Sequence, residues 1–235
     1  MILNLKGELI PDAWAEVYRF FGIESGYYCP ADVKAAIAAL ADGEELVLEI
    51  NSIGGSVDDA AEIYSALEKC KNPTKAEIQS LAGSAASYLA LSCDRVEIST
   101  PAQMMIHLAS WEMGGNKRDH TWAAQQLDSA DLSILDTYCR KCGEERREEL
   151  GRLMDEETYL TARQCLELGL VDAIIGQDQE DSPAEDAPLA LVASAYSNAV
   201  RAMRTLPDIR ELTERRENRL REMSEELAAE KNRYQ

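Results

Sequence analysis

Hydrophobic and polar positions follow two different periods along the first half of the chain, and together they predict an α/β protein. Apolar residues dominate or alternate over 45–51 and 76–81, which is typical of buried strands. Over 30–41 and 58–70 they recur every three or four positions, as in helices that pack against a sheet. Two strand–helix units in succession favour a right-handed, mostly parallel sheet covered by helices.

The remaining elements continue this alternation of strands and helices. Strands are predicted over 2–10, 95–98, 104–107 and 170–175, and helices over 11–21, 117–142, 144–154 and 161–169. Thr161 is a suitable N-cap for the last of these helices, and Gly169 is a suitable end. The helix over 117–142 is longer than one core face requires, so we expect part of it to form an interface in an oligomer.

The chain beyond Gly176 differs in composition from the rest. Residues 178–188 are acidic and contain two prolines, whereas helical periodicity resumes from 189. We therefore expect one folded domain over 1–176, an acidic linker over 177–188 and a helical tail over 189–235. The tail is either a solvated helix or a helix that binds a partner or acts as a scaffold. An exposed acidic linker is also a plausible region for self-cleavage.

The charge and the cysteines limit which partners and cofactors are expected. A net charge of −19 and a pI near 4.5 argue against a nucleic-acid partner, because phosphates require a basic surface. No secretory signal is visible, and no run approaches the roughly 18 apolar residues of a membrane span, so we expect a cytoplasmic protein. Among the six cysteines, Cys139 and Cys142 form a C-x-x-C pair. No second pair or nearby histidine accompanies it, so we expect neither a metal nor another cofactor.

Small residues occupy two positions where a strand leads into a helix. The first holds Gly54 and Gly55, adjacent glycines that allow backbone N–H groups to turn toward a ligand. The second, over 83–87, holds five consecutive small residues that leave the hydroxyl of Ser87 uncrowded at a helix N-terminus. This second run is either a tight packing joint or the place of a nucleophile whose oxyanion the helix stabilises.

The sequence contains two histidines, His107 and His120. His107 ends a predicted buried strand, whereas His120 lies in a polar run and is expected to be exposed. A histidine at a strand end is often a core residue whose ring nitrogens are hydrogen-bonded. In a chain with a candidate nucleophile, His107 is also the leading candidate for the general base.

Four segments in this order resemble one known family. They are N-S-I-G-G-S-V over 51–57, A-G-S-A-A-S-Y over 82–88, M-M-I-H over 104–107, and the stretch 157–172 that contains Y-L-T-A-R-Q-C-L-E-L-G-L-V-D. The chain from 2 to 176 resembles the Clp-type serine peptidases of the ClpP/crotonase fold, and it is most similar to the branch of phage prohead proteases. The resemblance implies a spiral of β-β-α units with a long handle-type helix.

The resemblance also implies roles for individual residues. Ser87 matches the nucleophile and His107 the general base, and the backbone N–H groups of Gly55 and Tyr88 match the oxyanion hole. These roles agree with a hydroxyl at a helix N-terminus beside one histidine.

The third member of the triad is where this sequence departs from the family. The family often has an aspartate just before the aromatic–leucine pair, and Glu157 stands at that position here. A glutamate can also orient an imidazole. Asp155 is the alternative, because it shares a face with Glu157 if the segment is extended. Asp172 is interpreted as a structural or capping residue.

The function implied by the resemblance is that of a serine endopeptidase that cleaves capsid or scaffold polypeptides during phage head maturation. The sequence has no ATP-binding motif, so cleavage is expected to be ATP-independent. A ring-shaped homo-oligomer is implied, in the host cytoplasm or within the prohead. Substrate binding is expected to resemble strand addition, which is led by the backbone.

Three alternatives remain beside the peptidase. The first is a non-catalytic assembly protein that keeps the fold as an oligomeric scaffold. The second is an acyl-CoA enzyme of the crotonase type, which has no use for a Ser–His pair on these elements. The third is a Ser–Lys dyad of the signal-peptide-peptidase kind. It is disfavoured because the position that matches the base is His107.

Overall fold

The computed structural model of the protein describes residues 1–177, which fold around a single eight-stranded sheet. The strand order is β2-β1-β3-β4-β5-β8, and β6 and β7 lie off this path. The strands are β1 (Ile2–Leu9), β2 (Tyr27–Tyr28), β3 (Leu46–Gly55), β4 (Thr74–Gly83), β5 (Arg95–Ser99), β6 (Gln103–Ile106), β7 (Thr158–Thr161) and β8 (Ala173–Ile175). All neighbouring strands are parallel except β6 and β7. This confirms the predicted mixed α/β fold with a mostly parallel sheet.

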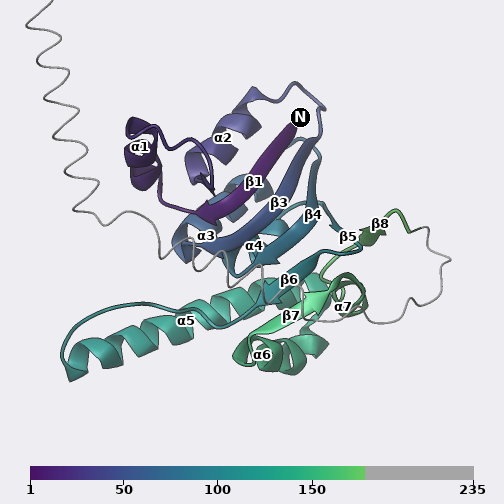
Figure 1. Ribbon diagram of the computed structural model, residues 1–235. Helices are drawn as coiled ribbons and strands as arrows, with labels where there is room; N and C mark the ends of the chain where they lie inside the picture. The colour runs from purple at the N-terminus through teal and green to yellow at the C-terminus, as the bar shows by residue number, and fades with distance from the viewer. Residues whose placement is uncertain (178–235) are drawn as a thin grey trace, which may run out of the picture. The chain divides into compact units, whose positions relative to one another are not determined.

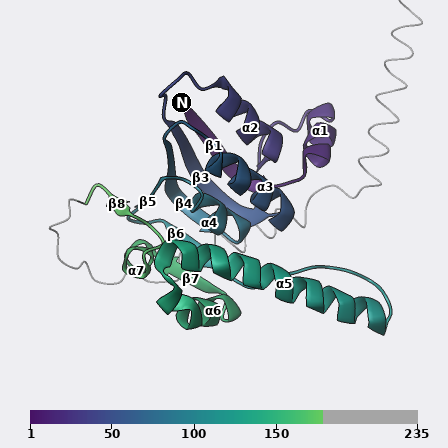
Figure 2. The same ribbon diagram turned by 180° about the vertical axis from the view of Figure 1, so that it is seen from behind.

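Helices α2, α3 and α4 pack on one face of the sheet, behind the strands in Figure 1 and in front of them in Figure 2. The helices are α1 (Asp12–Phe20), α2 (Pro30–Ala39), α3 (Val57–Glu68), α4 (Ala85–Ala90), α5 (Lys117–Cys142), the 3₁₀ turn η1 (Glu144–Arg146), α6 (Arg147–Asp155) and α7 (Ala162–Leu168). One face of the central strands packs in the core, in which residues such as Leu48, Ile50 and Ile78 are completely buried. The positions that alternate with them, such as Glu49 and Glu77, are only half-buried, which is the period of two expected of a β-strand.

The long helix α5 has the bounds that the periodicity predicts. Its N-cap is Asn116, whose side-chain oxygen accepts hydrogen bonds from the N–H groups of Arg118 and Asp119. The N-terminal half of α5 projects away from the sheet, and the connection from β6 runs back along it (Figure 1). Thr161 caps α7 as expected, and Gly169 ends that helix in the left-handed conformation.

Strand β4 changes its partner along its length. Residues 75–78 pair with β5, whereas residues 81–83 pair with β6. The end of β4 and the end of β6 therefore lie side by side, and the residues that follow each strand come together.

Helix α4 begins three residues earlier than expected, because it includes the last three of the small residues over 83–87. Its first residue is Ala85, so Ser87 is the third residue of a helix and not part of the turn. This difference decides the identity of the candidate nucleophile. The predicted linker and helical tail lie outside the described residues. None of the helices within residues 1–177 is both long and apolar enough to cross a bilayer.

Candidate active site

The site forms where β4 and β6 end beside each other. Gly83 pairs with Met105, and the N–H of the next residue, Ser84, donates to the carbonyl of Met105 at 2.8 Å. His107 follows β6 directly, and its Nε2 lies 2.7 Å from the Oγ of Ser84. This is the hydrogen-bonding distance expected between a serine nucleophile and its general base. Both side chains are half-buried.

Ser84 occupies a sharp strand-to-helix turn with an unusual backbone conformation. Its φ and ψ are 51° and −127°, a region that residues with a Cβ rarely adopt. Gly54, at the end of β3, packs directly against this turn: a Cβ on Gly54 would lie 2.5 Å from the carbonyl oxygen of Gly83 and 2.7 Å from the Cβ of Ser84. The turn therefore needs a glycine beside it. A serine on such a strained turn is presented in the same way as the nucleophile of α/β hydrolases.

Ser87, the serine expected from the sequence, lies elsewhere. It is completely buried, and its Oγ donates to the carbonyl oxygen of Ser84 at 2.6 Å. The hydroxyl of Tyr138 on α5 lies 2.6 Å from the same Oγ. Because the single hydroxyl proton of Ser87 is used for Ser84, Tyr138 is the donor in this second bond.

The structure therefore brings Ser84, not Ser87, to His107. The physical reason is that α4 starts at Ala85, which turns Ser87 inward toward α5. No local sequence signal separates the two serines, because the end of β4 is set by its pairing with β6, which comes from a distant part of the chain.

The candidate oxyanion donors change when Ser84 replaces Ser87 as the candidate nucleophile. Tyr88, the fourth residue of α4, has its ring hydroxyl bonded to the carbonyl of Val57 at 2.6 Å. The residue next to Ser84 is Ala85, the first of the helix, whose N–H has no acceptor within α4. Gly55 keeps its expected place, since it lines the same cavity as Ser84 and Ala85.

The cavity beside the Ser84–His107 pair is small, with a volume of about 40 Å³. It is lined by Gly55, Val57, Ser84, Ala85, Tyr88, His107, Ala109, Ser110, Ile134 and Tyr138. This volume holds a water molecule but not a large side chain. A substrate would therefore have to lie along the outer edge, where Gly55 is exposed.

The two predicted acids, Glu157 and Asp155, both have exposed side chains. β6 and β7 are antiparallel with Ile106 opposite Thr158, so continuing this register by one pair sets His107 opposite Glu157. Glu157 has a positive φ of 49°, which ends the ladder there. Within residues 1–177, no hydrogen bond or ion pair joins His107 to either acid. Asp155 is the last residue of α6.

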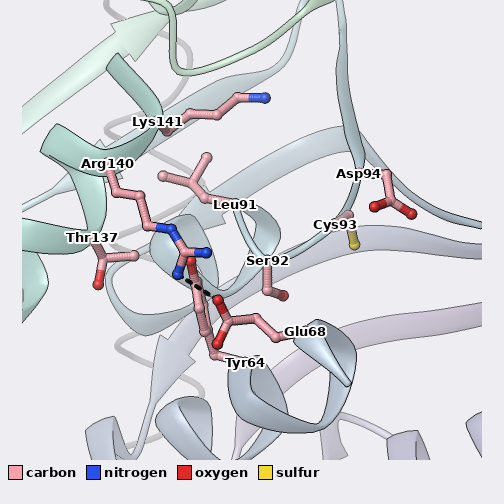
Figure 3. Close-up of a pocket in the computed structure, with 9 residues that line it drawn as sticks. All are labelled: Tyr64, Glu68, Leu91, Ser92, Cys93, Asp94, Thr137, Arg140 and Lys141. Carbon is pink, nitrogen blue, oxygen red and sulfur yellow. Dashed lines mark hydrogen bonds and ion pairs between the residues drawn. The ribbon is translucent and has the colours of Figure 1, made fainter. Parts of the chain in front are cut away.

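Asp172 is structural, as the sequence indicates. Its carboxylate accepts the backbone N–H of Val96 at 2.7 Å and pairs with Lys141 of α5. Lys141 also lines a larger polar pocket of about 300 Å³ between α3, the segment after α4 and the C-terminal part of α5 (Figure 3). There Arg140 is paired with Glu68 and lies against Tyr64. Both cations of this pocket are thus already neutralised, and none of the candidate catalytic residues lines it.

Cysteine chemistry has little support in the described part of the chain. All six cysteines are free thiols, and burial raises the pKa of Cys93 and of Cys165 to about 12. Residues 1–177 contain no group of three His, Cys, Asp or Glu side chains placed to hold a metal ion.

A serine hydroxyl on a strained strand–helix turn, beside a histidine and a glycine-rich neighbouring turn, is the arrangement of a serine hydrolase. Residues 31–178 match the sequence model of the family described as Clp protease, which is more than half of the chain. The chain therefore belongs to the Clp protease family, and thus to a family of serine-type peptidases.

Individual relatives agree with this assignment. The chain is 29% identical over 137 residues to the "ATP-dependent Clp protease proteolytic subunit 1" of Chlamydia muridarum (strain MoPn / Nigg), covering 57% of this chain and 71% of the relative. The protein of the same name from Protochlamydia amoebophila (strain UWE25) is 28% identical over 142 residues, covering 59% and 68%.

Proposed function

We propose that the protein is a serine endopeptidase that uses Ser84 as its nucleophile and His107 as its general base. The observation that carries the proposal is the 2.7 Å separation between the Oγ of Ser84 and the Nε2 of His107. Membership of the Clp protease family supports the same reaction.

The reaction follows from the positions of these groups. His107 Nε2 accepts the proton of Ser84 Oγ as this oxygen attacks the carbonyl carbon of a peptide bond. The tetrahedral intermediate collapses when the protonated imidazole gives that proton to the leaving amine. A water molecule, activated by His107 in the same way, then hydrolyses the acyl-enzyme and restores Ser84.

The proposed oxyanion hole consists of the backbone N–H groups of Gly55 and Ala85. Ala85 takes the place that the sequence suggested for Tyr88, because it is the residue next to the proposed nucleophile. For the acid that orients His107 we propose Glu157, which directly precedes β7, the strand that pairs with the one leading to His107. Asp155 is less favoured, because it lies two residues further from β7 than Glu157 does and is the last residue of α6.

The proposed substrates are capsid or scaffold polypeptides in phage head assembly, cleaved without ATP in the host cytoplasm or the prohead. A cavity of only about 40 Å³ favours a substrate that is held by its backbone, as in strand addition, with little selection of side chains. The proposed assembly is a homo-oligomeric ring. The exposure of Trp111, Trp122 and Leu132 along the projecting α5 and its connection supports an interface there, since each is at least half exposed.

Labelling with a fluorophosphonate probe tests the proposed chemistry. Peptide mapping of the labelled wild-type protein is expected to find the adduct on Ser84. Ser84→Ala and His107→Ala should abolish labelling, whereas Ser87→Ala should keep it. An adduct on Ser87 would overturn the assignment of the nucleophile. No adduct in the intact oligomer would favour the non-catalytic assembly protein.

Incubation with the capsid and scaffold polypeptides encoded by the same genome tests the proposed substrates. Mass spectrometry should find defined cleavage products with wild type and none with Ser84→Ala. Intact capsid and scaffold chains, alongside cleavage of an unrelated unfolded polypeptide, would contradict the role in head maturation while leaving the peptidase chemistry in place.

A further inference from the structure

Helix α5 contributes a carboxylate to the segment that follows His107. The backbone N–H of Ala109, two residues after His107, donates to the Oδ1 of Asp131 at 2.6 Å. This bond spans 22 residues of sequence and joins the middle of α5 to the chain just beyond the histidine. A second contact joins the same two elements, because the rings of Trp111 and Trp122 meet edge to face at 5.5 Å.

Asp131 occupies a defined place on α5. On the C-terminal side the helix is held to the body of the protein: Tyr138 is buried against Ser87, and Lys141 pairs with Asp172. Arg140 also pairs with Glu68 (Figure 3). On the N-terminal side α5 projects from the sheet (Figure 2). Asp131 lies near the middle of α5, three residues before Ile134, which lines the cavity beside Ser84.

The carboxylate of Asp131 also interacts with the imidazole of His107. Partial burial raises the pKa of Asp131, and the negative charge of Asp128 adds to this rise. The N–H of Ala109 and the charge of His107 act in the opposite direction and favour the ionised form. The bond from Ala109 holds this carboxylate beside the segment that carries His107.

We infer that Asp131 is a positioning residue for the general base: it fixes the segment after His107 and stabilises the imidazolium that forms during catalysis. The inference rests on the proposed roles of Ser84 and His107. Asp131 touches neither the substrate nor the reacting atoms, so its effect is transmitted through Ala109 and through charge. Glu157, across the β6–β7 register, would act on the histidine from the other side.

The groups around His107 define the controls. The charge of Asp131 acts on it from α5, with Asp128 one turn away, and Glu157 directly precedes β7. The neighbouring hydroxyl of Ser84 is neutral. Asp128→Asn is the matched control, because Asp128 is exposed and does not bond to Ala109. Asp131→Asn keeps an acceptor for the Ala109 N–H and removes only the charge, whereas Asp131→Ala removes both.

The first measurement does not require activity. Diethyl pyrocarbonate modifies neutral imidazole, so the pH dependence of modification at His107, resolved by peptide mapping in the Ser84→Ala background, reports its protonation. Asp131→Asn should move the midpoint at His107 to lower pH by at least about half a unit, because imidazolium loses a favourable charge. His120 serves as the internal standard and should not move. Equal midpoints at His107 in the Asp131→Asn and Asp128→Asn proteins would overturn the electrostatic part of the inference.

The second measurement is the rate of fluorophosphonate labelling and of peptide hydrolysis in the protein with Ser84 intact. Asp131→Asn should lower kcat about tenfold with little change in KM, and Asp131→Ala about a hundredfold, since a small displacement of a catalytic group has an effect of this size. Asp131→Glu should restore part of the rate. Equal rates for the Asp131→Ala and Asp128→Asn proteins would overturn the inference. If wild type is not labelled at all, the proposed function fails instead, and the diethyl pyrocarbonate result still decides the role of Asp131.

Discussion

The hydroxyl of Tyr138 donates to the Oγ of Ser87 at 2.6 Å, and Ser87 in turn donates to the carbonyl oxygen of Ser84. The two bonds connect α5 to the strained turn that carries the proposed nucleophile. Tyr138 is completely buried, and burial raises the pKa of its hydroxyl far above the ordinary value, so it remains a donor at every relevant pH.

Replacement of Ser87 should therefore reduce stability without removing the nucleophile. Ser87→Ala leaves the Tyr138 hydroxyl buried without its acceptor and should lower the free energy of unfolding by about 1–3 kcal/mol. Tyr138→Phe removes the donor and leaves the Ser87–Ser84 bond, so we expect a smaller loss of about 1 kcal/mol. Urea unfolding of both variants and of the double variant checks this order. A larger loss for Tyr138→Phe would contradict the direction assigned to the hydrogen bonds.

Gly54 should tolerate no side chain. A Cβ there meets the backbone of the nucleophile turn, and the φ of +90° adds strain, so Gly54→Ala should abolish labelling of Ser84 and lower stability. Gly22→Ala is the matched control, because Gly22 has a φ of +73° but no atom within 4 Å of its Cβ position. Chemical denaturation and probe labelling of the two variants compare them. Equal effects would mean that strain alone, without the contact to Ser84, explains the need for glycine.

Thiol reagents should not inhibit the enzyme at pH 8. With a pKa of about 12, the thiols of Cys93 and Cys165 are ionised to roughly one part in ten thousand at that pH. Iodoacetamide should thus leave peptidase activity intact, and mass spectrometry should find these two residues unmodified until urea unfolds the protein. Rapid inhibition by iodoacetamide would point to a catalytic thiol and contradict the serine mechanism.

Because of the same buried thiols, we expect the stability of the folded protein to fall at alkaline pH. Their pKa is raised in the folded protein from the ordinary value of 9.0, so the thiol form favours folding. Their contribution is fully present below pH 9 and is lost as the pH rises toward 12. Urea midpoints measured from pH 8 to 11 should fall more slowly in the Cys93→Ala protein than in wild type. A parallel decline in both proteins would show that Cys93 does not set this limit.

The contacts of Asp172 should contribute more to the free energy of unfolding than an exposed ion pair does. Asp172 accepts the N–H of Val96 and pairs with Lys141, so it joins β5 to α5, and Asp172→Ala should lower the free energy of unfolding by about 1–2 kcal/mol. Glu167→Gln breaks an exposed i,i+4 pair with Arg163 and should cost no more than about 0.5 kcal/mol. Thermal or urea unfolding compares the two. Equal losses would argue that the bond to Val96 adds nothing to the ion pair.

The sequence predicts the fold well because the periodicity and the end signals of its elements agree. The bounds of α5 and the Thr161 cap follow from local patterns alone. The choice between Ser84 and Ser87 does not. Both serines sit among small residues, and only the pairing of Gly83 with Met105, which joins distant parts of the chain, sets where the strand ends and the helix begins.

No sequence pattern predicts a role for Asp131, for a different reason. It is separated from His107 by most of a loop and half of a helix, and nothing in its neighbourhood marks it as different from Asp128. Its importance appears only when α5 is packed and Ala109 is seen to donate to it.

The change of partner along β4 has a consequence for how the site can vary. Ser84 follows β4 and His107 follows β6, and these two strands are paired. The separation of the two residues is therefore set by the fixed spacing between neighbouring strands. Loops and helices elsewhere can lengthen, shorten or be replaced without disturbing that spacing. The proposed catalytic pair is thus fixed by the sheet, so changes in the surrounding segments could alter substrate preference while Ser84 and His107 keep their separation.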